Sequence, residues 1–479
     1  MTSSANSTAS AQWPAFALSV GAAVTLTSLL VFLVSPEIGK LLILALCAVI
    51  GLVAFLRHTH WALLLMLAIG PFYDFARAVL FPNTALVGAW QDIAVIGFVI
   101  AAIGNTRRPD FKWSFSYLDC AVVVYIAAYA FSALLTSNLA VWFYGFRWST
   151  LYAFFYLALK TFRFTDRGLK RIVSVTAGAL VASIMIGYWM IMTLGNQAYF
   201  ALLGALGFTV FGRAGEFRWP ATFGHPLVAS TSFALVLIIS TAYLLEEKRT
   251  GLRWFYSGIA IMALLACAAT LSRLGWAVGG VGVMGALWVN RGRFRANKKA
   301  ALLCGFVAVL GIAIVALAEP EMFAIATQMS DFDNLRIQSF RAVLGDSIRY
   351  PLGVGLGTAG AVSSVAREFG GQLNGVEAIT GDSVLLQVLR DTGWIGFFAL
   401  LAVCIGFIRK ALQGFQGSSS PQIRLLTLTT FAFSLGLLAN LMNVADVWPT
   451  KFYFWLFGAL SVAVVEGRVS REDSAALTS

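Results

Sequence analysis

Apolar runs long enough to cross a lipid bilayer recur along the whole chain, and they constrain its fold more than any other feature. Runs such as LALCAVIGLVAFL and AAVTLTSLLVFLV carry no charge, and with their flanks each reaches the roughly 20 residues of a spanning helix. Only 12% of the 479 residues are charged, about half the share typical of soluble domains. The sequence therefore predicts an all-α polytopic membrane protein.

Hydropathy predicts about 12–14 transmembrane helices. The candidate spans lie near 15–34, 39–56, 61–81, 86–104, 117–135, 139–160, 171–193, 223–244, 255–272, 274–290, 300–317, 392–408, 425–443 and 452–467. Pro71, Asp74 and Arg77 interrupt the third of these spans. We therefore expect a broken or re-entrant segment at that place.

Basic residues are concentrated in alternate connections between the spans. These connections contain Arg57, NTRRPDFK, KTFRFTDRGLKR, EEKRTGLR, RGRFRANKK, and RKALQGF continuing to Arg424, and the C-terminal tail adds Arg468 and Arg471. The positive-inside rule places this face, and with it both termini, in the cytoplasm. The net charge of +12 is then a signal of topology and a means of holding anionic lipid, and it does not indicate nucleic-acid binding.

Two long excursions, 194–222 and 318–391, fall on the opposite face. We expect the second to be a long outer loop that bears short helices, and long loops commonly carry function. The predicted organisation is N-terminal membrane helices at 1–210, central helices with arginine motifs at 211–317, the loop at 318–391, and C-terminal helices with a cytoplasmic tail at 392–479.

Arginines on this outer side are the main candidate functional residues. Arg147 lies within an apolar run, Arg273 lies at a span junction, and Arg218 lies in GEFRWPATFGHP. An arginine at a helix centre costs about 2.5–3.5 kcal/mol on insertion scales, so each needs a partner or a task. The planar guanidinium fits bidentate recognition of phosphate, and several such groups near the membrane surface suit a lipid diphosphate.

An alternative is that these arginines reach lipid headgroups or pair with carboxylates. The candidate partners are Glu216, Asp331 and Asp333. We favour a functional role for Arg218 and Arg273. The same reasoning treats Arg349, Arg367 and Arg390 as ordinary loop charges.

Other patterns indicate structure more than chemistry. The glycines of GVGLGTAG (353–360) lack a βαβ context, which favours a tight loop over a dinucleotide site. The carboxylates of SDFDN are expected to be solvated, and His58 and His60 to lie at the cytoplasmic interface. No histidine or carboxylate cluster has metal-ligand spacing, so we predict neither a metal nor a cofactor.

Four segments occur in a fixed order along the second half of the chain. They are FRWPATFGHPLVAS, TLSRLGW, RIQSFRAVLGDSIRYPLGVGLG and TGDSVLLQVLRDTGWIG. This series resembles the O-antigen ligase/polymerase superfamily. In that family an arginine precedes a Phe-x-His-Pro segment, Thr-x-Ser-Arg ends a later span, and a large periplasmic loop carries Pro-Leu-x-Gly-Val-Gly before a closing motif. The order and sidedness match over roughly residues 210–410, whereas the earlier part matches only in hydropathy.

One position departs from the ligase pattern. Where ligases carry a catalytic histidine, this chain has Asp382 followed by Ser383, and the spacing to Gly393 is kept. A carboxylate can also accept a proton from a hydroxyl, best when burial raises its pKa. Because polymerase-like members commonly lack the histidine and often carry an acidic residue there, the resemblance favours a polymerase.

The resemblance implies a metal-independent glycosyltransferase of the bacterial inner membrane that uses a polyprenyl-diphosphate-linked glycan at the periplasmic face. The implied catalytic residues are Asp382, Arg218 and Arg273, and the implied substrate-binding residues are Arg336, Arg341, Arg147, Trp219 and His225. For His225 a supporting structural role is slightly favoured, and Trp219 is a candidate for stacking on a sugar. The implied partners are the lipid-linked glycan and membrane lipid, with a chain-length regulator and a flippase as further candidates, and no nucleic acid.

Two alternatives to a polymerase stay open. A ligase would transfer the glycan to lipid A core or another acceptor. A secondary transporter would also need charges within the membrane, but transporters usually show repeats with paired broken helices. This chain has a single clearly interrupted span, at 61–81, and a long outer loop that transport does not require.

Overall fold

The computed structural model describes a bundle of membrane-length helices. It covers residues 58–80, 90–109, 111, 114–136, 138–208, 217–291, 331–358, 383–442 and 448–470. In this part of the chain, seven helices are long and apolar enough to cross a membrane. The all-α polytopic fold is confirmed, while the predicted spans at 15–34, 39–56 and 300–317 lie outside the described residues.

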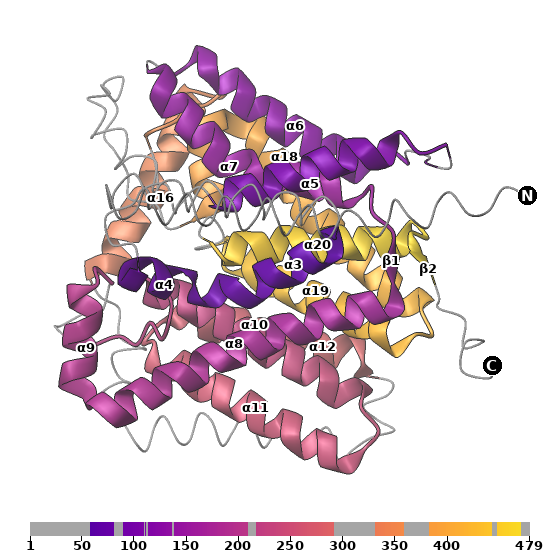
Figure 1. Ribbon diagram of the computed structural model, residues 1–479. Coiled ribbons are helices and arrows are strands. Elements are labelled where there is room, and N and C mark those ends of the chain that lie inside the picture. Colours follow the sequence, from indigo (N-terminus) through magenta and orange to yellow (C-terminus); the bar gives the residue numbers. More distant parts are fainter. Residues whose placement is uncertain are drawn as a thin grey trace, which may run out of the picture.

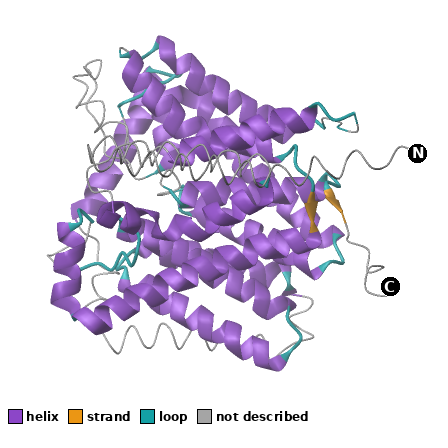
Figure 2. Cartoon of the chain, in the orientation of Figure 1, coloured by secondary structure: helices purple, strands orange, loops and turns teal. Residues whose placement is uncertain are grey.

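The helices follow the predicted spans closely. In chain order they are α3 (Thr59–Ile69), the 3-10 turn η1 (Gly70–Phe72), α4 (Tyr73–Leu80), α5 (Trp90–Thr106), α6 (Tyr117–Phe131), η3 (Ser132–Leu134), α7 (Leu139–Leu159), α8 (Asp166–Leu194), α9 (Asn196–Ala205), α10 (Pro226–Glu246), α11 (Thr250–Ala269), α12 (Arg273–Val289), α16 (Asp331–Arg349), α18 (Val384–Gly417), α19 (Pro421–Ala439) and α20 (Thr450–Val465). Two short strands, β1 (Phe164–Thr165) and β2 (Val469–Ser470), pair in parallel (Figure 2).

Helix α10 lies at the centre of the bundle. It packs against α8, α11, α12 and α19, and 89% of its most apolar window is buried inside the protein. Glycines let its neighbours approach closely: a Cβ on Gly275 of α12 would lie 2.8 Å from Ser230, and one on Gly282 would lie 2.6 Å from Ile238. Small residues at helix interfaces drive packing in membranes, where the hydrophobic effect gives little force between helices.

Successive helices run in opposite directions and give the bundle two distinct ends (Figure 1). At one end the basic connections meet: Phe164 N donates to Arg468 O at 3.1 Å, and Arg424 Nε lies 3.0 Å from Glu246 Oε1. The opposite end carries α4, α9 and α16. In the described part of the chain the basic connections thus lie on one side, and their assignment to the cytoplasm stays a prediction.

The third span is interrupted by a 3-10 turn, although Thr59–Val79 as a whole is long and apolar enough to cross a membrane. Helix α3 ends at Ile69, and Pro71 lies in η1 before the chain turns helical again in α4. Proline lacks the N–H of a helical hydrogen bond and clashes with the preceding turn, so a break forms there. The space beside the break is filled by Trp448, whose ring atom Cζ2 would lie 3.1 Å from a Cβ on Gly70.

The glycine-rich segment that follows α16 forms a tight loop held against α18. Gly353 and Gly355 adopt φ angles of +95° and +96°, which favour glycine. Val354 N donates to Arg390 O at 2.8 Å, and Leu356 N donates to Thr136 Oγ1 at 2.9 Å. These bonds join the loop to α18 and to Thr136, just after η3. The segment thus forms the tight loop that its glycines predict.

Helix α18 accepts this loop because it is kinked at Gly393, where φ is +68°. At the kink Trp394 N donates to Pro351 O at 3.1 Å instead of bonding within its own helix. A Cβ on Gly393 would lie 2.2 Å from the same carbonyl oxygen, so only glycine fits. The loop and the kink are thus one interlocked structure.

One sequence-based expectation about this region is wrong. The kink at Gly393 divides α18 into a short helix from Val384 and a longer one after it, close to the start of the predicted span at 392. Arg390 is not an ordinary loop charge, because its side chain is 1% exposed. Its Nη1 donates to Thr358 O at 2.7 Å, and its Nη2 lies 3.2 Å from Asp346 Oδ2 in α16. A cation this deeply buried needs such partners, because an unpaired charge in the protein interior is strongly destabilising.

We predict that Arg390→Ala lowers the stability of the purified protein by about 3 kcal/mol, because it leaves Asp346 and Thr358 O without their buried partner. The measurement is thermal unfolding in detergent. The matched control is Arg349→Ala, which removes an exposed arginine from the same end of the bundle and should change the midpoint little. Equal unfolding midpoints for the two variants would contradict a stabilising role for the contacts of Arg390 with Asp346 and Thr358.

Candidate active site

The segment that precedes α10 packs against the junction of α11 and α12. Trp219 N donates to Ala269 O at 3.2 Å, and Arg218 Nε donates to Thr270 O at 3.0 Å. Arg273 is the first residue of α12, three positions after Thr270. Arg218 is therefore bonded to the turn that leads into Arg273, and the shared role of the two arginines stays a prediction.

The tight turn between α11 and α12 presents Arg273 at this junction. Helix α11 ends at Ala269, and Leu271 adopts a positive φ of 49° in the turn. Thr270 Oγ1 accepts from Ser272 N at 3.3 Å, which closes the turn. The polar residues of TLSR thus shape the backbone, and the arginine follows at the helix start.

A carboxylate from the third span lies at the turn that leads into α10. Asp74 Oδ2 accepts from Gly224 N at 3.0 Å, and Thr222 Oγ1 donates to Pro71 O at 2.7 Å. The break between α3 and α4 is therefore docked on the turn that leads into α10. Sequence reasoning treated Asp74 only as an interruption and missed it as a member of the site, although a carboxylate inside an apolar run is a functional signal.

His225 caps α10. Its Nδ1 accepts from Leu227 N at 3.1 Å, and Pro226 occupies the first helical position. Side-chain acceptors at this position satisfy backbone N–H groups that have no partner within the helix, and proline is favoured directly after it. This geometry agrees with the supporting structural role expected of His225.

Trp219 lies in the core and not at a substrate surface. Its side chain is buried, with ring centroids 4.7 Å from Tyr188 and 5.5 Å from Phe233. A Cβ on Gly187 would lie 2.5 Å from the indole, so α8 closes over it. An enclosed ring offers no face to a sugar, and we therefore correct the prediction that Trp219 stacks on one. It anchors the segment that carries Arg218.

Arg147 has an internal partner. Its Nε donates to Asp92 Oδ1 at 2.6 Å, Nη2 pairs with the other carboxylate oxygen, and the guanidinium lies 5.8 Å from the Tyr144 ring centroid. This bidentate ion pair joins α7 to α5 and offsets the cost of placing the charge within the membrane region. Asp92 thus supplies the partner that Arg147 needs, so no substrate is required to balance the charge of Arg147.

The remaining predicted residues fall around the long outer loop. Arg341 lies on α16 with an exposed side chain, and Arg336 lies on the same helix. Asp382 lies outside the described residues. Ser383, the next residue, caps α18: its Oγ accepts from Leu386 N at 3.4 Å and donates to Leu441 O at 2.8 Å. The start of α18 is thereby tied to the end of α19.

The described residues include no group of three or more His, Cys, Asp or Glu side chains that could hold a metal ion. The charged residues that the described chain places at the α11–α12 junction are Arg218 and Arg273, and Asp74 lies at the turn before α10. Such a set can bind an anionic group and stabilise negative charge that develops on it. This is the chemistry that a diphosphate leaving group requires.

Comparison with known proteins agrees with the motif order. Residues 258–401 match the family model described as O-antigen ligase. The matched range contains Arg273, α16, the glycine-rich loop, Asp382 and the first part of α18, and it begins after Arg218. No curated protein matches the chain. The matched region, in a chain with several membrane-length helices, is thus similar to the O-antigen ligase family.

Proposed function

We propose that this protein is a glycosyltransferase of the bacterial inner membrane that polymerises polyprenyl-diphosphate-linked oligosaccharide repeat units at the periplasmic face. The observation that carries the proposal is the contact of Arg218 with Thr270 O, in the α11–α12 turn three residues before Arg273. This junction lies at the end of the bundle away from the basic connections, which the positive-inside rule assigns to the cytoplasm.

The reaction exchanges one bond at the anomeric carbon for another. The bond from the anomeric carbon to the diphosphate oxygen breaks, and the acceptor hydroxyl oxygen forms the new glycosidic bond and gives up its proton. The polyprenyl diphosphate leaves with the bonding electron pair. Arg218 and Arg273 bind its oxygens, and this attraction strengthens as negative charge develops, so it lowers the barrier.

Asp382 accepts the proton of the acceptor hydroxyl in this scheme. In the sequence it directly precedes Ser383, the cap of α18. The apolar flanks of the helices hold the two polyprenyl chains. No metal takes part in the scheme, because the arginines supply the positive charge that the leaving group needs.

A ligase is the second candidate, because the matched family model is described as O-antigen ligase. The two activities share the donor and the leaving group and differ in the acceptor. Asp382 in place of the ligase histidine favours the polymerase. A chain-length regulator and a flippase are proposed partners of the polymerase, and both termini are proposed to be cytoplasmic.

The glycan profile of a strain that lacks the gene tests the function. Loss of a polymerase should leave a single repeat unit on the final acceptor. Loss of a ligase should instead remove the attached glycan and accumulate lipid-linked polymer. A deletion strain whose attached and lipid-linked glycans both match the parent strain would refute both assignments.

We predict that Arg218→Lys and Arg273→Lys each lose most of the activity while the protein still inserts in the membrane. Lysine keeps the charge but lacks the planar fork that engages two phosphate oxygens. The measurement is polymer formation from purified lipid-linked repeat units at matched protein levels. Arg349→Lys, an exposed position, is the control and should keep normal activity. Full activity in both site variants would assign these arginines to packing alone.

We also predict that Asp382→Asn loses at least about 100-fold in rate with little change in folding, since a general base typically contributes this much or more. Asp382→His restores the ligase residue and is expected to keep part of the activity. Asp74→Asn is the comparison variant and should lose less activity than Asp382→Asn. Its amide oxygen can still accept the hydrogen bond from Gly224 N. A near-normal rate for Asp382→Asn would move the base elsewhere, with Glu216, Asp331 and Glu377 as the next candidates.

A further inference from the structure

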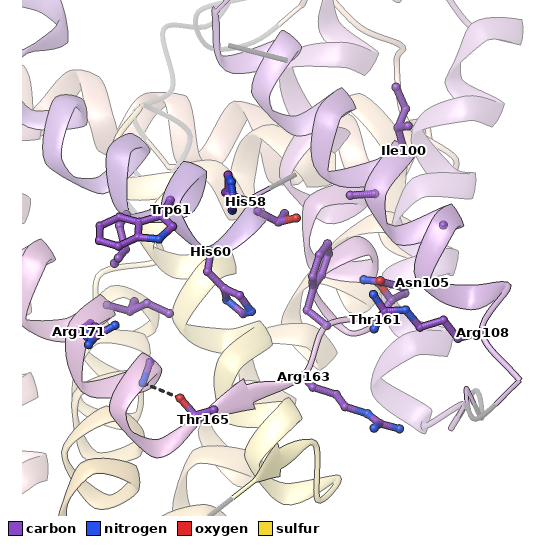
Figure 3. Close-up of a pocket in the computed structure, with 17 residues that line it drawn as sticks. His58, His60, Trp61, Ile100, Asn105, Arg108, Thr161, Arg163, Thr165 and Arg171 are labelled. Atoms are coloured by element: carbon purple, nitrogen blue, oxygen red, sulfur yellow. Dashed lines mark hydrogen bonds between the residues drawn. The ribbon is translucent and has the colours of Figure 1, made fainter. Parts of the chain in front are cut away.

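A cavity of about 880 Å³ lies at the end of the bundle opposite Arg218 (Figure 3). It is formed by the start of α3, the end of α5, and the connection from α7 through β1 into α8. Helices α3 and α8 both run from this cavity to the candidate active site, and β1 marks the cavity end in Figure 1. The cavity is therefore separated from the proposed catalytic residues by the thickness of the bundle.

The charge of the cavity is entirely basic among its described lining residues. Arg108 follows α5, Arg163 precedes β1 and Arg171 lies in the second turn of α8, so three segments each supply one guanidinium. No carboxylate belongs to this lining. Arg108 and Arg171 form no ion pair with any residue of the described chain, so their positive charge is not neutralised there. Three guanidinium groups around one cavity attract an anion.

Neutral polar groups complete the inner surface. Figure 3 shows His60 in the middle of the group, between Arg171 and Thr161. Its ring is held by Phe164, with the two centroids 5.6 Å apart in an edge-to-face arrangement. Asn105 also lines the cavity and carries an amide donor. These donors can complete the hydrogen bonding of a bound phosphate.

The outer rim is apolar and faces the surroundings of the bundle. Trp61 is 67% exposed and Ile100 is 45% exposed, and both line the cavity. Tryptophan is enriched at the level of lipid headgroups, where its ring is apolar and its N–H is polar. An apolar rim next to three arginines matches a molecule with hydrocarbon chains and an anionic head.

We propose that this cavity binds the phosphate group of an anionic phospholipid, with the acyl chains lying along Trp61 and Ile100. Arg108, Arg163 and Arg171 hold the phosphate, and the ligand ties α5, the α7–α8 connection and α3 together. A soluble phosphate ester has the same charged group, but it would leave the exposed apolar rim uncovered. The proposal does not depend on the glycosyltransferase assignment.

The experiment measures lipid binding by the purified full-length protein in a neutral detergent, with phosphatidylglycerol and phosphatidylcholine as probes. Without a charged membrane, the surface potential of a bilayer does not contribute. Arg108→Gln/Arg171→Gln should weaken phosphatidylglycerol binding at least about thirty-fold, since each variant position loses a charge-assisted hydrogen bond to the phosphate, and such a bond typically contributes roughly ten-fold in affinity. Arg107→Gln/Arg409→Gln is the matched control, because it removes two exposed arginines outside the cavity and should bind almost as the unchanged protein does.

Three results would overturn the proposal. Equal losses in the two double variants, or equal binding of the two lipids, would show a general charge effect and no site. Displacement of the lipid by inorganic phosphate, at phosphate concentrations near the dissociation constant of the lipid, would assign the cavity to a soluble phosphate ligand instead. Loss of phosphatidylglycerol binding in the cavity variant alone, without such competition, supports the lipid.

Discussion

The lipid core provides no hydrogen bonds to the backbone, and this constraint organises the whole structure. Where a helix breaks, another part of the protein must supply the missing partners. At η1 and the turn before α10, Thr222 bonds to Pro71 O and Asp74 bonds to Gly224 N. At the kink of α18, Trp394 N bonds to Pro351 O in the glycine-rich loop. Each interruption of a helix is thus bonded to a turn or loop from another part of the chain. One of these contacts fixes the turn before α10, which follows Arg218 in the sequence.

The two ends of the bundle use charge differently. At the basic end Lys160 is fully buried and lies 2.6 Å from Asp119 and 2.9 Å from Glu466, so its charge is spent on joining α6, α7 and the segment after α20. At the other end Arg147 and Arg390 are likewise paired with carboxylates. Arg218 and Arg273 both lie at the α11–α12 junction, where we propose that a lipid diphosphate binds.

Motif order predicted part of the candidate site but not its exact members. Arg218 and Arg273 were predicted from their residue type and their place beside spans, and the structure brings them to one junction. Asp74 was missed as a member because its partner, Gly224, is 150 residues away in the sequence. Trp219 was assigned to sugar binding because it adjoins Arg218, yet the closeness of Gly187 places its ring in the core.

The sequence alone determined the helical membrane fold, the approximate spans and the gathering of basic connections at one end, because hydropathy and charge act locally and every span must satisfy its own backbone. Only the tertiary structure decided which charges are partnered. Arg390 read as a loop charge until α16 and the glycine-rich loop enclosed it, and Arg147 met Asp92 across 55 residues of chain. Such pairs depend on how the helices pack together, and no local pattern encodes that packing.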